Sequence, residues 1–297
     1  MKRVGIVGLG DMGIGLAKNL LKSGFDLTGF DIREDRRQQL VDLGGKAAGN
    51  CREVAAAAVA VFVMVLNGDQ VKEVILGESG LLEALTPGST IIITATIHPS
   101  EIREVELPIV AKGVNLIDSP VSGGKSGADN GTLTLMAAAK KEVLDDCRDV
   151  LEAIGQNIFH VGEQIGTGQT VKASLQALIG ASYTAIFESL VLGVKAGVKA
   201  ETLYEVYSTS AVASPLFKNC AKLIMERRFK GTGSHMGTMY KDISISMKMA
   251  KEQGAAMFTA AAAYELFQAG KSMFPDEDVW SVVKLLEQIA GTEVKQS

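Results

Sequence analysis

The sequence predicts an α/β fold, a doubly wound and mostly parallel sheet followed by an all-helical second domain. Three observations support this prediction. Short apolar strands alternate with helices in the first half, the glycine pattern GLGDMG directly follows the first strand, and strand signals largely vanish after Gly168. We expect a first domain over residues 1–164 and a second over 165–297, joined by a long helix.

The first half alternates strands with helices along the chain. We expect strands over residues 3–8, 26–31, 59–66, 89–94, 114–118, 132–138 and 157–161. We expect helices over residues 11–23, 34–43 and 69–76, and another that begins at Pro99. The run 59–66 is apolar at every position, which is typical of a strand covered on both faces. This order predicts helices on both sides of the sheet.

The second half reads as helices, expected over residues 169–196, 200–210, 215–227, 237–252, 259–271 and 277–289. In the first of these, a buried stripe at helical spacing is expected from Val171, Leu175, Leu178 and Ile179. Lys172 and Gln176 lie among these residues, and a lysine is rarely fully buried without a partner. We expect Lys172 where the two domains meet, since ligand clefts often form there.

Composition narrows the classes of protein to consider. The 297 residues carry a formal net charge of −4, which disfavours a nucleic-acid binder. The three cysteines contain no CxxC pair, so we expect a reducing cytoplasm. We expect no signal peptide or membrane span, because the longest apolar run, residues 54–66, is shorter than the ~20 residues that cross a bilayer. The three histidines are far apart, so we expect no metal site.

GLGDMG has the context of a Rossmann-type dinucleotide site: a strand before it and a helix after it. Gly8 would allow the tight turn, Gly10 would admit a pyrophosphate, and Gly13 would let the helix pack closely. Asp31 ends the next strand, where a carboxylate binds a ribose 2′-hydroxyl and repels a 2′-phosphate, so we expect NAD. Arg33 leaves NADP open, because it could hold that phosphate or be a solvated charge.

Two further strand ends carry candidate ligand groups. Thr96 follows one strand, and the turn Ser122, Gly123 and Gly124 in DSPVSGG follows another. Such a glycine-rich turn could bind an anion through its backbone N–H groups, or could be a simple loop. Late in the chain, Lys241 and Asp242 could be functional or an exposed charge pair.

Taken in order, GLGDMGIGLAKNL, DSPVSGG, Lys172 and the Lys241-Asp242 pair resemble the β-hydroxyacid dehydrogenase family, which includes 3-hydroxyisobutyrate, tartronate-semialdehyde and threonate dehydrogenases. The resemblance covers the whole chain and implies that Lys172 is catalytic. Together with the motifs above, it assigns cofactor binding to Gly8, Leu9, Gly10, Asp11, Met12, Gly13, Asp31, Arg33, Leu66, Asn67, Thr96 and Lys241. It assigns substrate binding to Ser122, Gly123, Gly124, Lys172, Gln176 and Asp242.

The implied activity is hydride transfer between NAD(P) and a small β-hydroxy acid or its semialdehyde, by a homo-oligomer. Lys172 would move the hydroxyl proton, with its pKa lowered from about 10.4 by partial burial and by Lys241. Most members of the family carry asparagine where this chain has Gln176. The threonate dehydrogenase branch is similar in having glutamine there, whereas the tail SVVKLLEQIAG is more similar to hydroxymethylglutarate dehydrogenase.

Three alternatives remain beside this interpretation. An NADPH-dependent reductase of small aldehydes, such as glyoxylate or succinic semialdehyde, would favour a basic residue in place of Asp31. An imine reductase or a non-catalytic nucleotide-binding interaction module would lack Lys172.

Overall fold

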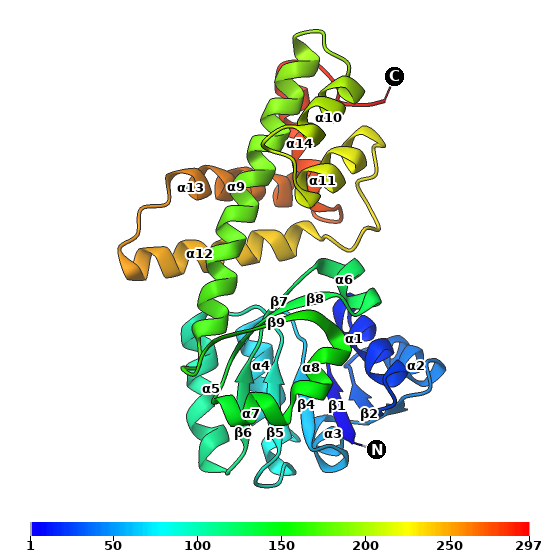
Figure 1. Ribbon diagram of the computed structural model, residues 1–297, viewed down its shortest axis with the longest axis vertical. Coiled ribbons are helices and arrows are strands. Elements are labelled where there is room, and N and C mark those ends of the chain that lie inside the picture. Colours follow the sequence, from blue (N-terminus) through cyan, green and yellow to red (C-terminus); the bar gives the residue numbers. More distant parts are fainter. Residues whose placement is uncertain (1, 297) are drawn as a thin grey trace. The chain divides into compact units, whose positions relative to one another are not determined.

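The computed structural model describes residues 2–296 (Figure 1). The chain forms two compact units, Met1–Lys172 and Ala173–Ser297. The division falls inside one long helix, α9 (Thr167–Lys195), whereas the sequence suggested a change of domain at residues 164 and 165.

The first unit is built on one twisted sheet (Figure 1). Its strands are β1 (Arg3–Val7), β2 (Asp26–Phe30), β3 (Lys46–Ala47), β4 (Ala60–Val63), β5 (Thr90–Ile93), β6 (Asn115–Asp118), β7 (Val121–Ser122), β8 (Leu133–Ala138) and β9 (Gly155–Gly162). They lie in the order β3-β2-β1-β4-β5-β6-β8-β7, and β9 pairs with β8. All pairs from β3 to β6 are parallel, and β8 runs antiparallel to β6 and β7. The mostly parallel sheet is therefore confirmed.

Strand register sends alternate side chains to opposite faces of this sheet. Ile6, Phe62, Ile92 and Ile117 are aligned across four neighbouring strands, and all are buried in one apolar cluster. Each next residue along β1, β4 and β5 (Val7, Val63 and Ile93) enters a second cluster on the other face. Because both faces are buried, these strands are apolar at nearly every position, and β4 is apolar throughout, as the sequence indicated for this run.

Helices cover both faces (Figure 1). They are α1 (Asp11–Lys22), α2 (Glu34–Asp42), α3 (Cys51–Ala57), α4 (Gly68–Leu76), the 3₁₀ helix η1 (Leu81–Glu83), α5 (Pro99–Ala111), α6 (Gly124–Asn130), α7 (Lys141–Asp146) and α8 (Arg148–Ile154). Buried residues of α1, α6 and α8 join the first cluster, and those of α3, α4 and α5 join the second. The predicted arrangement, with helices on both sides of the sheet, is therefore present.

Some local predictions were wrong. The strand expected over residues 59–66 ends at Val63, because the Val63 carbonyl accepts the N–H groups of both Thr94 and Ala95 and the ladder goes no further. Four short helices, α3, α6, α7 and α8, were not predicted. Each has six or seven residues, too few for helical periodicity to be visible in the sequence.

The second unit is helical, as predicted. After α9 it contains α10 (Ala200–Thr209), α11 (Pro215–Met225), α12 (Met236–Gln253), α13 (Phe258–Met273), the 3₁₀ helix η2 (Val279–Val282) and α14 (Val283–Ala290). Trp280, Phe187 and Phe267 form the centre of its core, and Tyr183 meets Trp280 edge-on at 5.8 Å between ring centroids. The helix expected over 277–289 begins as the 3₁₀ turn η2.

The buried stripe predicted for α9 was wrong in part, because Leu175 and Ile179 are only partly buried and the other two residues are exposed. Leu178 is 65% exposed and Val171 is also exposed, whereas Lys172 and Gln176 are 6% and 7% exposed. Within the second unit, a Cβ on Gly180 would lie only 2.7 Å from Ile243 of α12. The buried side therefore needs small residues where α12 approaches closely, whereas further along the helix Phe187 and Leu190 are buried in the core.

Candidate active site

The glycine turn between β1 and α1 has the geometry that a pyrophosphate requires. Gly8 has φ +92°, and a Cβ there would lie 2.2 Å from the carbonyl oxygen of Met64. A Cβ on Gly13 would lie 1.9 Å from the carbonyl oxygen of Gly8, so α1 packs directly on the turn. A Cβ on Gly10 would meet no atom within 4 Å, which leaves room for a phosphate at the start of α1. These residues fit a dinucleotide.

Both carboxylate oxygens of Asp31, just after β2, accept backbone N–H groups, and one of these bonds ties the residue to the glycine turn. Oδ2 accepts the N–H of Leu9 at 2.7 Å, and Oδ1 accepts the N–H of Arg33 at 2.9 Å. An ionised carboxylate can accept about four hydrogen bonds, so it retains capacity for ribose hydroxyls. The Arg33 guanidinium pairs with Asp35 at the surface, at 2.6 Å, and the side chain is well exposed.

Apart from Lys241, which lies on α12 of the second unit, the other predicted cofactor residues lie at the carboxyl ends of β1, β4 and β5, which are neighbours in the sheet. Met12 packs on the first core cluster, while Leu66 is largely exposed. Asn67 caps α4, its side-chain oxygen accepting the N–H of Gln70 at 2.9 Å. Thr96 follows β5 and is partly buried. Asp11 begins α1, where Arg36 pairs with it.

The turn expected to bind the substrate links a strand to a helix. Ser122 ends β7, Gly123 has φ +129° and caps α6, and Gly124, the first residue of α6, has φ +59°. A Cβ on Gly124 would meet no atom within 4 Å. Backbone in this conformation presents successive N–H groups at a side-chain-poor surface, which suits an anion.

A buried polar network, which the sequence analysis missed, joins three elements of the first unit. The side chain of Gln169, in the first turn of α9, donates to Asp118 Oδ1 and to the carbonyl oxygen of Ala95, both at 3.0 Å. Its own oxygen accepts the N–H of Ile97 at 3.0 Å. Asp118 Oδ2, at the end of β6, accepts the N–H groups of Gly166 at 2.9 Å and Gln169 at 3.3 Å. Thr96 lies between Ala95 and Ile97, whose backbone groups bond to the Gln169 side chain.

Burial controls the charge of this network. Asp118 and Gln169 are fully buried, and burial raises the pKa of Asp118 to about 6, although hydrogen bonds from Gln169 and Gly166 oppose the change. Gly168 is required beside them, because a Cβ there would lie 2.7 Å from the carbonyl oxygen of Asp118. The sequence feature that could have indicated this network is the segment GTGQTVK, in which Gln169 lies one helical turn before Lys172.

Lys172 is the last residue of the first unit and is almost fully buried in the second turn of α9. In the second unit, Gln176 Nε2 donates to Asp242 Oδ2 at 2.5 Å. Asp242 Oδ1 lies 2.9 Å from Lys241 Nζ. Asp242 is buried, so this pair is more than an exposed charge pair, and the second unit brings Gln176, Lys241 and Asp242 together.

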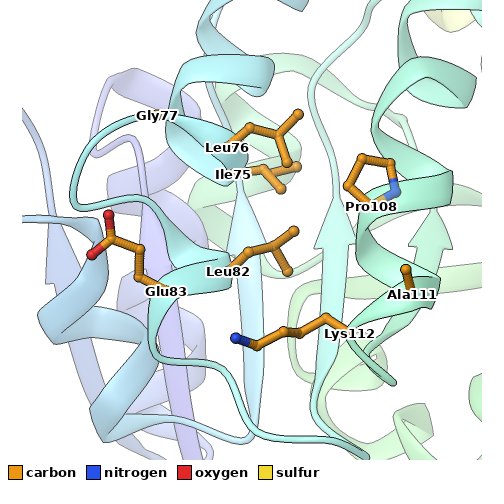
Figure 2. A pocket seen from close by; sticks show the side chains of 8 residues that line it. All are labelled: Ile75, Leu76, Gly77, Leu82, Glu83, Pro108, Ala111 and Lys112. Carbon is orange, nitrogen blue, oxygen red and sulfur yellow. The ribbon is translucent and has the colours of Figure 1, made fainter.

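A surface hollow of about 470 Å³ lies elsewhere on the first unit, between α4, η1 and α5 (Figure 2). Ile75, Leu76, Leu82 and Pro108 form its apolar walls, and none of the predicted site residues lines it. Within residues 2–296, the structure has no group of three or more His, Cys, Asp or Glu side chains that could hold a metal ion.

Comparison with known proteins agrees with this geometry. Residues 3–162 match the family described as the NAD binding domain of 6-phosphogluconate dehydrogenase, and residues 166–286 match the NAD-binding family of NADP-dependent 3-hydroxyisobutyrate dehydrogenase. The 2-(hydroxymethyl)glutarate dehydrogenase of Eubacterium barkeri is 35% identical over 98% of this chain and 97% of its own length. The chain belongs to the β-hydroxyacid dehydrogenase family.

Two further relatives agree with this assignment. An L-threonate dehydrogenase of Cupriavidus necator is 30% identical, with 97% of each chain covered. The solved structure of a 3-hydroxyisobutyrate dehydrogenase from Salmonella typhimurium is similar, with a TM-score of 0.88 and 29% identity over 96% of this chain and 100% of the other. This member of the β-hydroxyacid dehydrogenase family is an NAD(P)-dependent dehydrogenase that acts on the CH–OH group of a small hydroxy acid.

Asp118 should make the stability of the fold depend on pH. Its folded pKa of about 6 exceeds the unfolded value of about 3.9, so its contribution is fully present below about pH 4 and is lost as pH rises through 6. The difference corresponds to roughly 3 kcal/mol. Urea denaturation at about pH 4.5 to about pH 7.5 should show the advantage of wild type over Asp118→Asn shrinking by an amount of this order.

Asp145→Asn is the matched control for this measurement. Asp145 lies at the surface, and its bond to Lys141 lowers its pKa. The stability of the Asp145→Asn variant should therefore still fall as pH rises, as in wild type. Parallel stability profiles for wild type and Asp118→Asn would contradict the assignment of the slope to Asp118.

Proposed function

We propose that this dehydrogenase acts on a small carboxylate bearing a hydroxyl one or two carbons away and a further polar group, with a four-carbon sugar acid of the threonate type as the favoured substrate. The observation that carries the proposal is the buried Gln176 amide. Because its nitrogen donates to Asp242, its oxygen is oriented to accept a hydrogen bond from a hydroxyl. Glutamine also reaches about one bond further than the asparagine of most relatives.

We assign the remaining roles as follows. Residues 1–164 bind the dinucleotide, and residues 165–297 serve substrate binding and assembly. Backbone N–H groups of Ser122, Gly123 and Gly124 hold the substrate carboxylate. Lys172 removes the hydroxyl proton in oxidation and returns it in reduction. The nicotinamide supplies the hydride chemistry when it is bound.

Lys172→Ala should lower turnover by about 10²–10⁴-fold, because proton transfer is lost. Dinucleotide binding should survive, since the glycine turn and Asp31 are untouched. The measurements are steady-state turnover with a panel of hydroxy acids, and NADH titration by fluorescence. Lys141→Ala, on a surface lysine, is the control and should be fully active. Turnover of Lys172→Ala within tenfold of wild type would remove this residue from the mechanism.

Asp31 should make NAD the preferred cofactor, because its carboxylate repels a 2′-phosphate. Asp31→Ser should erode the ratio of kcat/KM values for NAD over NADP, while Asp31→Asn separates loss of charge from loss of an acceptor oxygen. A wild-type preference for NADP would mean that Arg33, released from Asp35, outweighs Asp31.

The substrate assignment is tested by comparing threonate with 3-hydroxyisobutyrate, which has fewer hydroxyls. A site that pairs with a substrate hydroxyl rejects analogues lacking it by up to ~10⁴-fold. Gln176→Asn should shift the preference toward the less hydroxylated acid. Equal or higher kcat/KM for 3-hydroxyisobutyrate in wild type would end the threonate interpretation, and an unchanged preference in the variant would make Gln176 a structural substitute.

We further propose a cytoplasmic homo-oligomer. Helix α9 is long and apolar enough to cross a bilayer by length and composition, a test that core helices of soluble proteins also pass. Its exposed side carries Leu178 and Leu192, 65% and 71% exposed, and a second copy of the chain would cover such an apolar stripe.

The double variant Leu178→Glu/Leu192→Glu should therefore reduce the mass measured by light scattering after size exclusion. Leu107→Glu, at a similarly exposed position on α5, should leave the mass unchanged. A monomeric wild type, or an unchanged mass in the double variant, would refute this assembly.

A further inference from the structure

The phosphate-binding turn of this chain carries an acidic residue at an unfavourable place. Asp11 is the first residue of α1 and lies between the second and third glycines of the turn. Dinucleotide phosphates bind at this helix end through its N–H groups and positive dipole. A carboxylate there suits the helix but would repel both phosphates. Something in the chain must offset this charge.

Arg36, on α2, reaches back to the turn and supplies the opposite charge. Its Nη2 lies 3.1 Å from Asp11 Oδ1, and both side chains are partly buried, at 21% and 30% exposure. The same guanidinium is held by Gln39 through Nη1 at 3.5 Å, and its Nε lies 4.0 Å from Asp35. Arg36 is therefore positioned by its own helix before any ligand arrives.

The neighbouring arginines are engaged elsewhere. Arg33 forms two bonds to Asp35, at 2.6 and 3.1 Å. Arg37 Nη1 donates to the backbone oxygens of Asp31 and Ile32, at 2.6 and 3.3 Å. Arg36 is thus the member of this group whose charge is directed at the glycine turn.

We propose that Arg36 is a positioning residue for cofactor binding that acts through Asp11. By pairing with the carboxylate, it cancels the negative charge in the turn and holds the Asp11 side chain in one place. The helix end then attracts the pyrophosphate as it would in a neutral turn. This inference rests on dinucleotide binding and is independent of which hydroxy acid is the substrate.

The test is a double-mutant cycle read out by NADH binding to the full-length protein, followed by fluorescence titration. Arg36→Met should raise the Kd about three- to tenfold, because the Asp11 charge then faces the phosphates in a partly screened setting. Asp11→Asn should bind as well as wild type or more tightly. The double variant Asp11→Asn/Arg36→Met should return to within about twofold of wild type.

Two controls make the cycle specific. Arg52→Met removes the same charge from an exposed position of the first unit, where Arg52 pairs with Glu83, and should leave the Kd for NADH nearly unchanged. Raising the salt from about 0.05 M to about 0.5 M should shrink the Arg36→Met defect, since screening weakens repulsion between charges. Thermal unfolding followed in parallel should show that all variants are folded.

Three results would overturn the proposal. An unchanged Kd in Arg36→Met would mean that the ion pair has no part in binding. A double variant as weak as Arg36→Met would show that Arg36 contacts the cofactor itself. Weak binding in Arg36→Met and in the double variant, together with a lowered Tm in these two variants, would show that Arg36 only supports the fold.

Discussion

The buried Asp118 carboxylate and its hydrogen bonds to α9 are the constraint on which the first unit depends. A buried charge is costly unless it is hydrogen-bonded, and this one accepts two backbone N–H groups and the Gln169 amide. The Gln169 side chain in turn donates a hydrogen bond to the carbonyl oxygen of Ala95 and accepts one from the N–H of Ile97. The carboxyl ends of β5 and β6 and the start of α9 are therefore fixed together, one helical turn before Lys172.

This constraint explains why the first turns of α9 are polar on their buried side. Gln169, Lys172 and Gln176 follow one another at about one-turn intervals, and all three are buried. In the first unit the amide holds the strand ends, and in the second the Gln176 amide is held by Asp242. Leu178 and Leu192 are left on the exposed side of the helix, where we propose that a second copy of the chain covers them.

Much of the fold could be predicted because its strongest signals are local. The central sheet strands are apolar at nearly every position, and the glycine turn is read directly from the spacing of Gly8, Gly10 and Gly13. The Gln169 network could not be predicted, because its partners lie more than 50 residues away in sequence. The buried side of α9 was misjudged because its first turns bury small residues such as Ala173 and Gly180, which give a weaker hydrophobic signal than the exposed Leu178.

The most direct test of this constraint is amide hydrogen exchange in Gln169→Leu, a variant that removes the side-chain amide and keeps a side chain of similar size. We expect protection to fall together at the backbone amides of Ile97 and Gly166, because both N–H groups belong to one network, while the amides of β1 keep their wild-type protection. Loss of protection at Ile97 alone, with Gly166 exchanging as in wild type, would show that the Asp118 bonds stand without Gln169 and would contradict the claim that one network fixes the strand ends to α9.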